Sequence, residues 1–166
     1  MTNNALLVRE VSQNDYGQYH KIRSENKNLY WTGYDKPPDY NSFKDWFEKR
    51  IVDPDKHLYL VYENNNCVGS LNIDYYESYA AIGYSIIEIF EGKGLATKMV
   101  EKAILLIKND AKGRITISKV IAWINENNVG SSRVANKNGM YKSKEQKLKV
   151  RFGKEEIYYQ YCLELR

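Results

Sequence analysis

The sequence predicts a mixed α/β fold in which helices flank a central, mainly antiparallel sheet. Three β-rich runs follow one another with short turns between them, a pattern typical of an antiparallel meander. An amphipathic run and another β-type run come next, and a strand-helix-strand connection of this length places its two strands parallel. The chain has 166 residues, enough to bury one core without metal or disulfide help. We therefore expect one α/β (α+β) domain spanning residues 1–166.

The first third of the chain is expected to supply one strand and two helices. Residues 6–11 are β-type, and the polar residues at 12–15 offer caps for a helix that continues to about Lys27. Residues 30–40 contain one glycine and two prolines, which predicts a loop. Ser42, with an aspartate three residues later, is expected to open the second helix.

The middle of the chain is expected to form the meander and its covering helix. Residues 58–62 and 68–76 are β-rich, and the intervening residues 63–66 predict a hairpin with a slightly long turn. Residues 79–87 predict the third strand. From about 94 to 108 the apolar residues recur with helical spacing and the charged residues lie opposite, so this helix is expected to pack on the sheet.

The last third is expected to complete the sheet. Residues 117–124 form another β-type run, and a helix is predicted over 129–138, just before a glycine. Two further strands, at 142–152 and 156–165, are expected to form a hairpin around Gly153.

Charge and composition limit the possible partners. Twenty-five basic and 21 acidic residues give a formal net charge of +4, and the lysines are scattered along the chain. This balance suits a nucleotide-type anion, whereas nucleic acid favours a denser basic stripe or interleaved stacking aromatics. We therefore expect no nucleic-acid partner.

The cysteines and the apolar runs indicate neither a metal site nor a membrane segment. Cys67 and Cys162 lie far apart without nearby histidines, so zinc spacing is absent and both are expected to be buried thiols. The first residues lack a secretory pattern, and no apolar run approaches the roughly 20 residues that span a bilayer. We expect a cytoplasmic protein without a membrane partner.

A glycine-containing turn connects the third meander strand to the next helix. Unpaired N–H groups at a helix start lie at the positive end of the helix dipole, which makes such a turn a site for phosphate or pyrophosphate. Neither glycine is followed by the Lys-Ser/Thr pair of a P-loop, and the third glycine of a dinucleotide-binding loop is replaced by a threonine. The candidate ligand-binding residues are Glu91, Gly92, Lys93, Gly94, Leu95, Ala96 and Thr97.

This turn resembles the coenzyme A motif of the GNAT family of N-acetyltransferases. The family motif reads Gln/Arg-x-x-Gly-x-Gly/Ala, and this chain matches it at Gly94 and Ala96, with Glu91 in the first position. In the family, backbone N–H groups hold most of the pyrophosphate, so the glutamate is expected to be tolerated.

A second segment strengthens the resemblance. Residues 128–140 look like the N-x-x-S-x-R-V-x-x-K-x-G-F/M segment of the branch that includes the ribosomal-protein-alanine acetyltransferases. Residues 82–84 resemble the I-G-Y strand of the same branch, and order and spacing agree with the family over about residues 58–140. Taken one at a time, the glycines at 92 and 94 also fit an ordinary turn, and Asn128 and Gly139 fit an ordinary helix start and helix end.

The resemblance implies a GNAT-like fold whose parallel strand pair splays apart to admit the pantetheine arm of acetyl-CoA. The arm is expected to pair with backbone near Ile86, and Asn128 and Arg133 join the turn as coenzyme-binding residues. Acetyl-CoA is thus the expected co-substrate and acetyl donor, and no metal is implied. The implied activity is acetyl transfer to a primary amine by direct attack on the thioester.

The resemblance also suggests catalytic residues. Many family members use a tyrosine on the last helix to protonate the departing thiolate, but Ala135 aligns with that position. Ser131 is therefore the first candidate for assisting the thiolate, and Tyr84 is the second. The carboxylates Asp74, Glu77 and Glu88 and the two histidines have ordinary structural explanations, so no base is assigned.

The acceptor amine is left open. Residues 31–34 and Tyr40 lie in the region that covers the acceptor in the resembled family, and their aromatic rings fit either a ligand wall or helix packing. An amino sugar on a nucleotide, a protein N-terminus and a small-molecule amine are all candidates. A monomer or a homodimer is expected, and the alternative function is a non-catalytic acyl-CoA sensor.

Overall fold

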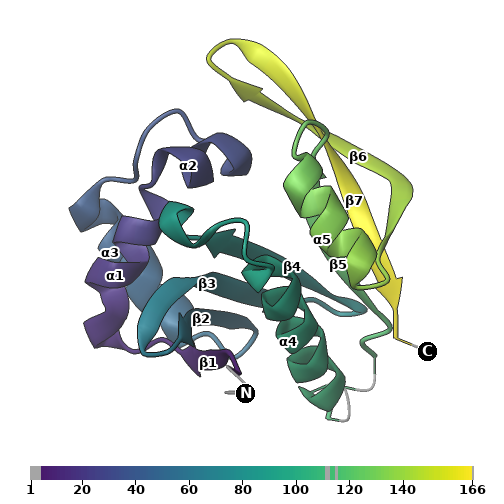
Figure 1. Cartoon of the computed structure of the whole chain (residues 1–166), viewed down its shortest axis with the longest axis horizontal. Helices are drawn as coiled ribbons and strands as arrows, with labels where there is room; N and C mark the ends of the chain where they lie inside the picture. The colour runs from purple at the N-terminus through teal and green to yellow at the C-terminus, as the bar shows by residue number, and fades with distance from the viewer. Residues whose placement is uncertain (1–4, 111–112, 115, 166) are drawn as a thin grey trace.

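One seven-stranded mixed sheet organises the chain, with the strand order β1-β2-β3-β4-β5-β7-β6 (Figure 1). The computed structural model describes residues 5–110, 113–114 and 116–165. All neighbouring strands are antiparallel except the pair β4 and β5. The strands are β1 Leu7–Glu10, β2 Lys56–Glu63, β3 Asn66–Tyr75, β4 Tyr79–Ile86, β5 Lys119–Asn125, β6 Tyr141–Arg151 and β7 Lys154–Glu164. The predicted mixed, mainly antiparallel sheet with one parallel pair is confirmed.

Five α-helices and two short 3-10 segments connect the strands in the described part of the chain. The helices are α1 Tyr16–Arg23, α2 Asn26–Thr32, α3 Tyr40–Ile51, α4 Leu95–Asp110 and α5 Val129–Lys137. The 3-10 segments are η1 Gln13–Asp15 and η2 Glu88–Phe90. None of the helices among these residues is both long and apolar enough to cross a bilayer.

The sheet carries a separate apolar core on each face. Successive side chains of a strand point to opposite faces. On β2, Leu58 and Leu60 pack in a cluster with Phe47 of α3, whereas Tyr59 and Val61 belong to the cluster that contains α4. Helices α1 and α3 therefore cover one face and α4 covers the other.

The amphipathic pattern of α4 is confirmed by its packing. Met99, Val100, Ala103 and Ile107 have no exposed surface and lie in the larger cluster. The predicted helix therefore begins one residue later than expected, at Leu95, and buries the face that its spacing indicated.

The prediction of one helix through Lys27 was wrong, and the loop predicted at 30–40 is shorter than expected, covering residues 33–39. Helix α1 ends at Arg23, and α2 begins again at Asn26. The buried Asn28 side chain donates from Nδ2 to the carbonyl of Ile22 (2.9 Å), which satisfies a carbonyl at the end of α1. This bond joins residues six apart, a spacing that no common capping motif has, so the sequence pattern did not reveal the break.

Other element bounds differ by small amounts. The turn between β2 and β3 contains only Asn64 and Asn65, both with positive φ, so it is tighter than predicted. Strand β5 begins at Lys119 and not at 117, and β4 ends at Ile86 and not at 87. Differences of one or two residues are ordinary at strand ends.

The parallel pair separates soon after it begins. Only three residue pairs join β4 to β5, from Tyr79–Lys119 to Ala81–Ile121. Strand β4 continues to Ile86 along β3, whereas β5 continues to Asn125 along β7. The two strands diverge, and the predicted splayed pair is confirmed.

The first prediction concerns the ion pair that holds β1 to η1. Arg9 donates to both carboxylate oxygens of Asp15 (2.8 and 2.9 Å), and the Ser12 N–H donates to one of them (2.8 Å). The hydrogen bonds from Arg9, aided by Ser12, lower the pKa of Asp15 from 3.8 to about 2. Asp15→Asn should lower the free energy of unfolding at neutral pH by about 1 kcal/mol.

The difference in the free energy of unfolding between variant and wild type should shrink as the pH falls from about 4 towards 2. The Asp15 carboxylate stabilises the fold only while it is ionised, and its lowered pKa keeps it ionised down to that range. Urea unfolding across a pH series measures this. Glu101→Gln, which removes an exposed carboxylate on α4, is the control and should change little at any pH. If the difference in the free energy of unfolding between Asp15→Asn and wild type stayed constant down to pH 3, the lowered pKa of Asp15 would be contradicted.

Candidate functional site

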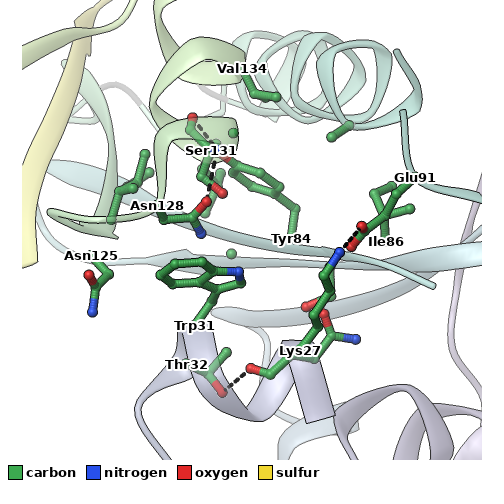
Figure 2. Close-up of a pocket in the computed structure, with 18 of the residues that line it drawn as sticks. Lys27, Trp31, Thr32, Tyr84, Ile86, Glu91, Asn125, Asn128, Ser131 and Val134 are labelled. Atoms are coloured by element: carbon green, nitrogen blue, oxygen red, sulfur yellow. Dashed lines mark hydrogen bonds and ion pairs between the residues drawn. The ribbon is translucent and has the colours of Figure 1, made fainter. Parts of the chain in front are cut away.

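A cavity of about 880 Å³ opens where β4 and β5 separate. Its walls come from β3, β4 and β5, the turn before α4, one side of α5, helix α2 with part of α1, and one residue each of β6 and β7. Figure 2 shows Lys27 and Trp31 of α2 on one side of β4, and Asn128 and Ser131 at the start of α5 on the other side. The cavity therefore joins segments from the first 34 residues to segments beyond residue 120.

The predicted glycine turn forms one end of this cavity. Gly92 and Gly94 have φ of +75° and +74°, a conformation that is costly for residues with a Cβ atom. Because the first intrahelical bond runs from the N–H of Lys98 to the carbonyl of Gly94, the N–H groups before Lys98 have no helix partner. These amides lie at the positive end of the α4 dipole and suit an anionic group.

All but one of the seven predicted turn residues line the cavity. The exception is Lys93, whose ammonium lies 5.5 Å from the centre of the Phe90 ring. The side chain of Lys93 is therefore outside the cavity, which leaves its backbone as the part that can serve the turn.

Glu91, the residue that departs from the family motif, forms an ion pair with Lys27 of α2 (Figure 2). The hydrogen bond to Glu91 raises the pKa of Lys27 above its ordinary value. The carboxylate beside the turn is thus neutralised by a lysine 64 residues away in the sequence. Sequence reasoning missed Lys27, because no local pattern connects the two positions.

The edge of β4 that faces the cavity has unpaired backbone groups. The N–H of Ile87 donates to the carbonyl of Val68 on β3 (2.8 Å). Neighbouring residues of a strand direct their N–H groups to opposite sides, so the N–H of Ile86 points away from β3. Pairing with β5 has already ended at Ala81, and this N–H faces the gap.

The two predicted catalytic side chains lie together in the middle of the cavity. Tyr84 and Ser131 both line it, and the Tyr84 hydroxyl donates to the backbone carbonyl of Ser131 (3.2 Å). Burial raises the pKa of Tyr84 to about 12, so the phenol keeps its proton at neutral pH. Tyr84 thus uses its one O–H in the bond to Ser131 and would have to leave it to donate elsewhere, whereas no such bond engages the Ser131 hydroxyl among the described residues.

The start of α5 places the other predicted residues. Asn128 caps the helix, because its Oδ1 accepts from the N–H of Ser131 (3.1 Å). Asn128 and Arg133 line the cavity, as expected of coenzyme-binding residues. Ala135 is fully buried in the core and does not line the cavity.

None of the side chains considered as a base lies in the cavity. Asp74 is held by Arg50 and Lys56, Glu77 lines a separate and smaller cavity, and Glu88 lines neither. Among the residues that the structure describes, Glu91 is the only carboxylate that lines the main cavity, and no histidine lines it.

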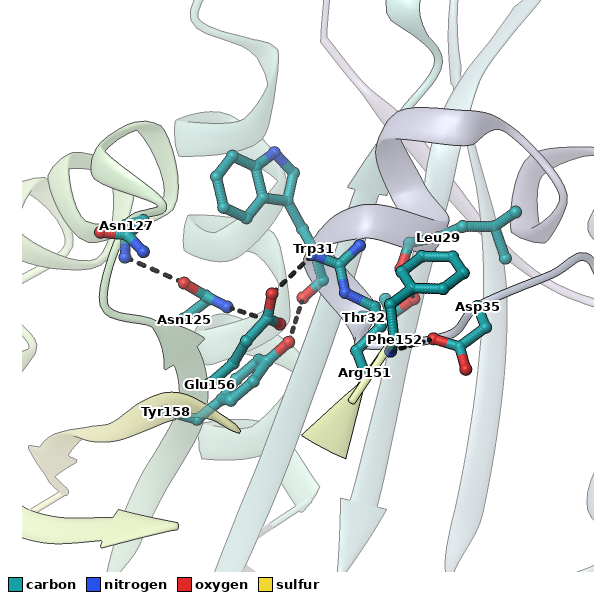
Figure 3. A network of polar contacts seen from close by, with 10 residues as sticks. All are labelled: Leu29, Trp31, Thr32, Asp35, Asn125, Asn127, Arg151, Phe152, Glu156 and Tyr158. Carbon is teal, nitrogen blue, oxygen red and sulfur yellow. Dashed lines mark hydrogen bonds and ion pairs between the residues drawn. The ribbon is translucent and has the colours of Figure 1, made fainter. Parts of the chain in front are cut away.

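The end of the cavity opposite the turn contains residues that the sequence did not indicate. Lys149 of β6 donates to the carbonyl of Thr32 (3.1 Å). Tyr158 of β7 donates to the carbonyl of Trp31 (3.4 Å), as Figure 3 shows. The sequence separations are 117 and 127 residues, so no local signal could have found these contacts. Burial, and then the charge of Arg23, lower the pKa of Lys149.

The aromatic residues at 31–34 and Tyr40 divide between two roles. Trp31 and Tyr34 line the cavity. Tyr40 instead packs against Tyr16, with ring centres 5.0 Å apart.

In the described part of the chain, no group of three or more His, Cys, Asp or Glu side chains is arranged to hold a metal ion.

Comparison with known proteins gives a family and a fold. A family model described as an acetyltransferase (GNAT) domain matches residues 5–141. A comparison with curated proteins found no match.

Several solved structures share the fold at low sequence identity. A spermidine N-acetyltransferase from Vibrio cholerae, solved with CoA and spermine, has a TM-score of 0.81 and 14% identity, covering 96% of this chain and 95% of its own. An acetyltransferase from Salmonella typhimurium that modifies the N-terminal serine of ribosomal protein L7/L12 has a TM-score of 0.77 and 17% identity, with 98% and 96% coverage. A GNAT-family acetyltransferase from Bacillus anthracis has a TM-score of 0.77 and 19% identity, with 96% and 95% coverage. With the family match over most of its length, the chain belongs to the GNAT acetyltransferase family.

Proposed function

We propose that this protein transfers the acetyl group of acetyl-CoA to a primary amine. The observation that carries the proposal is that the free amides at Gly92–Thr97 and the unpaired edge of β4 open into one cavity. The amides suit the diphosphate of coenzyme A, and the strand edge suits its amide-containing pantetheine arm. Family membership supports the same donor.

The coenzyme would lie along β4 with its phosphates at the start of α4. Arg133 and Lys137 of α5 line the same end of the cavity and add positive charge for the phosphates. The Lys27–Glu91 ion pair reduces the repulsion that the carboxylate would otherwise exert on them. Backbone N–H groups near Ile86 would then stabilise the negative charge that grows on the thioester oxygen.

The chemical step forms a bond from the amine nitrogen to the acetyl carbon and breaks the carbon–sulfur bond. The nitrogen loses its proton, and the departing thiolate gains one or accepts a strong hydrogen bond. We assign assistance to the thiolate to the hydroxyl of Ser131, with that of Tyr84 as the second candidate. Both line the cavity, and burial raises the pKa of Tyr84 to about 12, so that its phenol keeps its proton at neutral pH.

Within the family, residues 128–140 support the branch that includes the ribosomal-protein-alanine acetyltransferases. Membership in that branch does not decide between a protein N-terminus, an amino sugar on a nucleotide and a small-molecule amine as acceptor.

The second prediction tests the coenzyme-binding turn. Gly94→Ala should place a Cβ at φ +74°, which costs about 1 kcal/mol and turns the amides away from the diphosphate. Calorimetric titration with coenzyme A should show a dissociation constant raised about tenfold or more. The matched control is Gly153→Ala in the β6–β7 turn, where φ is +72° and a Cβ likewise meets nothing within 4 Å.

The control should lose similar stability and keep its affinity for coenzyme A. Equal affinities in the two variants would contradict the role of the turn. Absence of any binding heat with the wild type would overturn the proposed function. Coenzyme binding without thiol release from acetyl-CoA, across a broad amine panel, would favour an acyl-CoA sensor instead.

The third prediction concerns thiolate departure. Ser131→Ala removes a hydroxyl and keeps the carbonyl that accepts from Tyr84, and Tyr84→Phe removes the second hydroxyl. The variant that lacks the assisting group should lose about tenfold to a hundredfold in kcat, with coenzyme A affinity unchanged. A thiol-release assay measures this, and Tyr79→Phe, on the same strand but outside the cavity, should behave as wild type. Normal rates in both test variants would remove both residues from the mechanism.

A further inference from the structure

Two cations meet at the end of the cavity farthest from the glycine turn. We call this region the acceptor end and define it by Arg23, Trp31, Thr32, Tyr34, Lys149 and Tyr158, all of which line the cavity. The guanidinium of Arg23 lies 5.6 Å from the centre of the Tyr34 ring, and the ammonium of Lys149 lies 6.0 Å from the same point. The two positive charges therefore share one aromatic neighbour.

Neither cation forms an ion pair with a carboxylate among the described residues, although the charge of Glu156 acts on Lys149 and raises its pKa in part. The Nε atom of Arg23 is buried and has no hydrogen-bond partner among the described residues. The ammonium of Lys149 donates to a backbone carbonyl, that of Thr32. Burial and the charge of Arg23 lower the pKa of Lys149, as expected for like charges brought together out of water. A ligand oxyanion would offset this cost.

Two carboxylates beside the acceptor end already accept hydrogen bonds from other groups. Glu156 accepts from Arg151 (2.6 Å) and from Asn125 (3.3 Å), and Asp35 accepts from the N–H of Phe152 (3.2 Å) (Figure 3). Among the described residues lining the whole cavity there are five lysine or arginine side chains and one carboxylate. That carboxylate, Glu91, pairs with Lys27 at the other end.

We propose that the acceptor amine carries an oxyanion group, a carboxylate or a phosphate, which Arg23 and Lys149 bind. This rests on the acetyltransferase function proposed above. A planar guanidinium presents paired N–H groups that match the two oxygens of such a group, and the ammonium adds a second donor. The spermine bound in the Vibrio cholerae structure is a polycation, the opposite charge from the one that these two side chains attract.

The charge of the acceptor end also bears on the protonation of the amine. The attacking nitrogen must be neutral, and the described cavity lining offers neither an unpaired carboxylate nor an imidazole to take its proton. Positive neighbours lower the pKa of an ammonium group. An α-amino group, with a pKa of about 8, needs a smaller shift to be neutral near pH 7 than an alkylamine near 10.4 does. Arg23 and Lys149 thus select for the oxyanion, and only the positive charge that the oxyanion leaves uncompensated acts on the amine.

A thiol-release assay on matched amines tests this inference. One pair is an α-amino acid and its amide, and the other is an amino sugar with and without a nucleoside diphosphate. Spermidine and a short peptide with an amidated C-terminus and no acidic side chain complete the panel. The oxyanion-bearing member of one pair should have a kcat/KM about tenfold or more above that of its neutral partner, mainly through KM. The pair that shows the preference tells whether the oxyanion is a carboxylate or a phosphate.

Variants assign the preference to its residues. Arg23→Gln and Lys149→Gln should each raise KM for the anionic amine about tenfold and change KM for the neutral partner much less, so that the preference between the two is lost. Lys142→Gln is the matched control, because Lys142 lies on the same strand as Lys149 but packs on Tyr159 outside the cavity. Equal rates on charged and neutral partners, or a preference for spermidine or the peptide, would overturn the inference and leave the proposed function standing.

A direct binding measurement covers the case in which no panel amine reacts. Protein saturated with coenzyme A would be titrated with inorganic phosphate, with tryptophan fluorescence as the readout because Trp31 lines the acceptor end. A saturable change that Arg23→Gln abolishes would support the inference. Absence of Arg23-dependent phosphate binding would overturn it. Failure of coenzyme A itself to bind would overturn the proposed function and this inference together.

Discussion

The short parallel pairing between β4 and β5 is the constraint on which the rest of the site depends. Three residue pairs hold the strands together, and beyond Ala81 each strand keeps only its antiparallel neighbour. A continuous sheet would use the N–H of Ile86 in a backbone hydrogen bond and would close the cavity. Because the strands diverge, the edge of β4 beyond Ala81 is unpaired in the middle of the sheet. The two apolar cores, one on each face, stabilise the sheet around this opening.

Helix α2 connects the two ends of the cavity. Its first turn carries Lys27, which neutralises Glu91 beside the glycine turn, and its last turn holds the carbonyl that accepts from Lys149. A seven-residue helix is about 10 Å long, so one rigid element fixes both ends. Movement of α2 would change the charge beside the turn and the shape of the acceptor end together.

The parts of the site that were predictable have local signals. Gly92 and Gly94 need positive φ, Asn128 has the character of a helix cap, and α4 has helical spacing, so each can be read within a few residues. The remaining parts depend on contacts between distant segments. Ion pairs and hydrogen bonds over 64 to 127 residues bring Lys27, Lys149 and Tyr158 to the cavity, and side-chain type alone does not distinguish them from the many other lysines and tyrosines.

The coenzyme site and the acceptor end also differ in how much of each the family model covers. The family model matches residues 5–141, which include the splayed strands, the glycine turn and α5. Lys149 and Tyr158 lie beyond that segment, on the β6–β7 hairpin that extends past α5 in Figure 1. The hairpin contributes no group to the turn that we assign to the coenzyme, and it supplies one of the two cations of the acceptor end. Under the proposed function, changes in the hairpin and at the end of α1 would alter the acceptor, while the glycine turn and the splayed strands would keep the geometry of the donor.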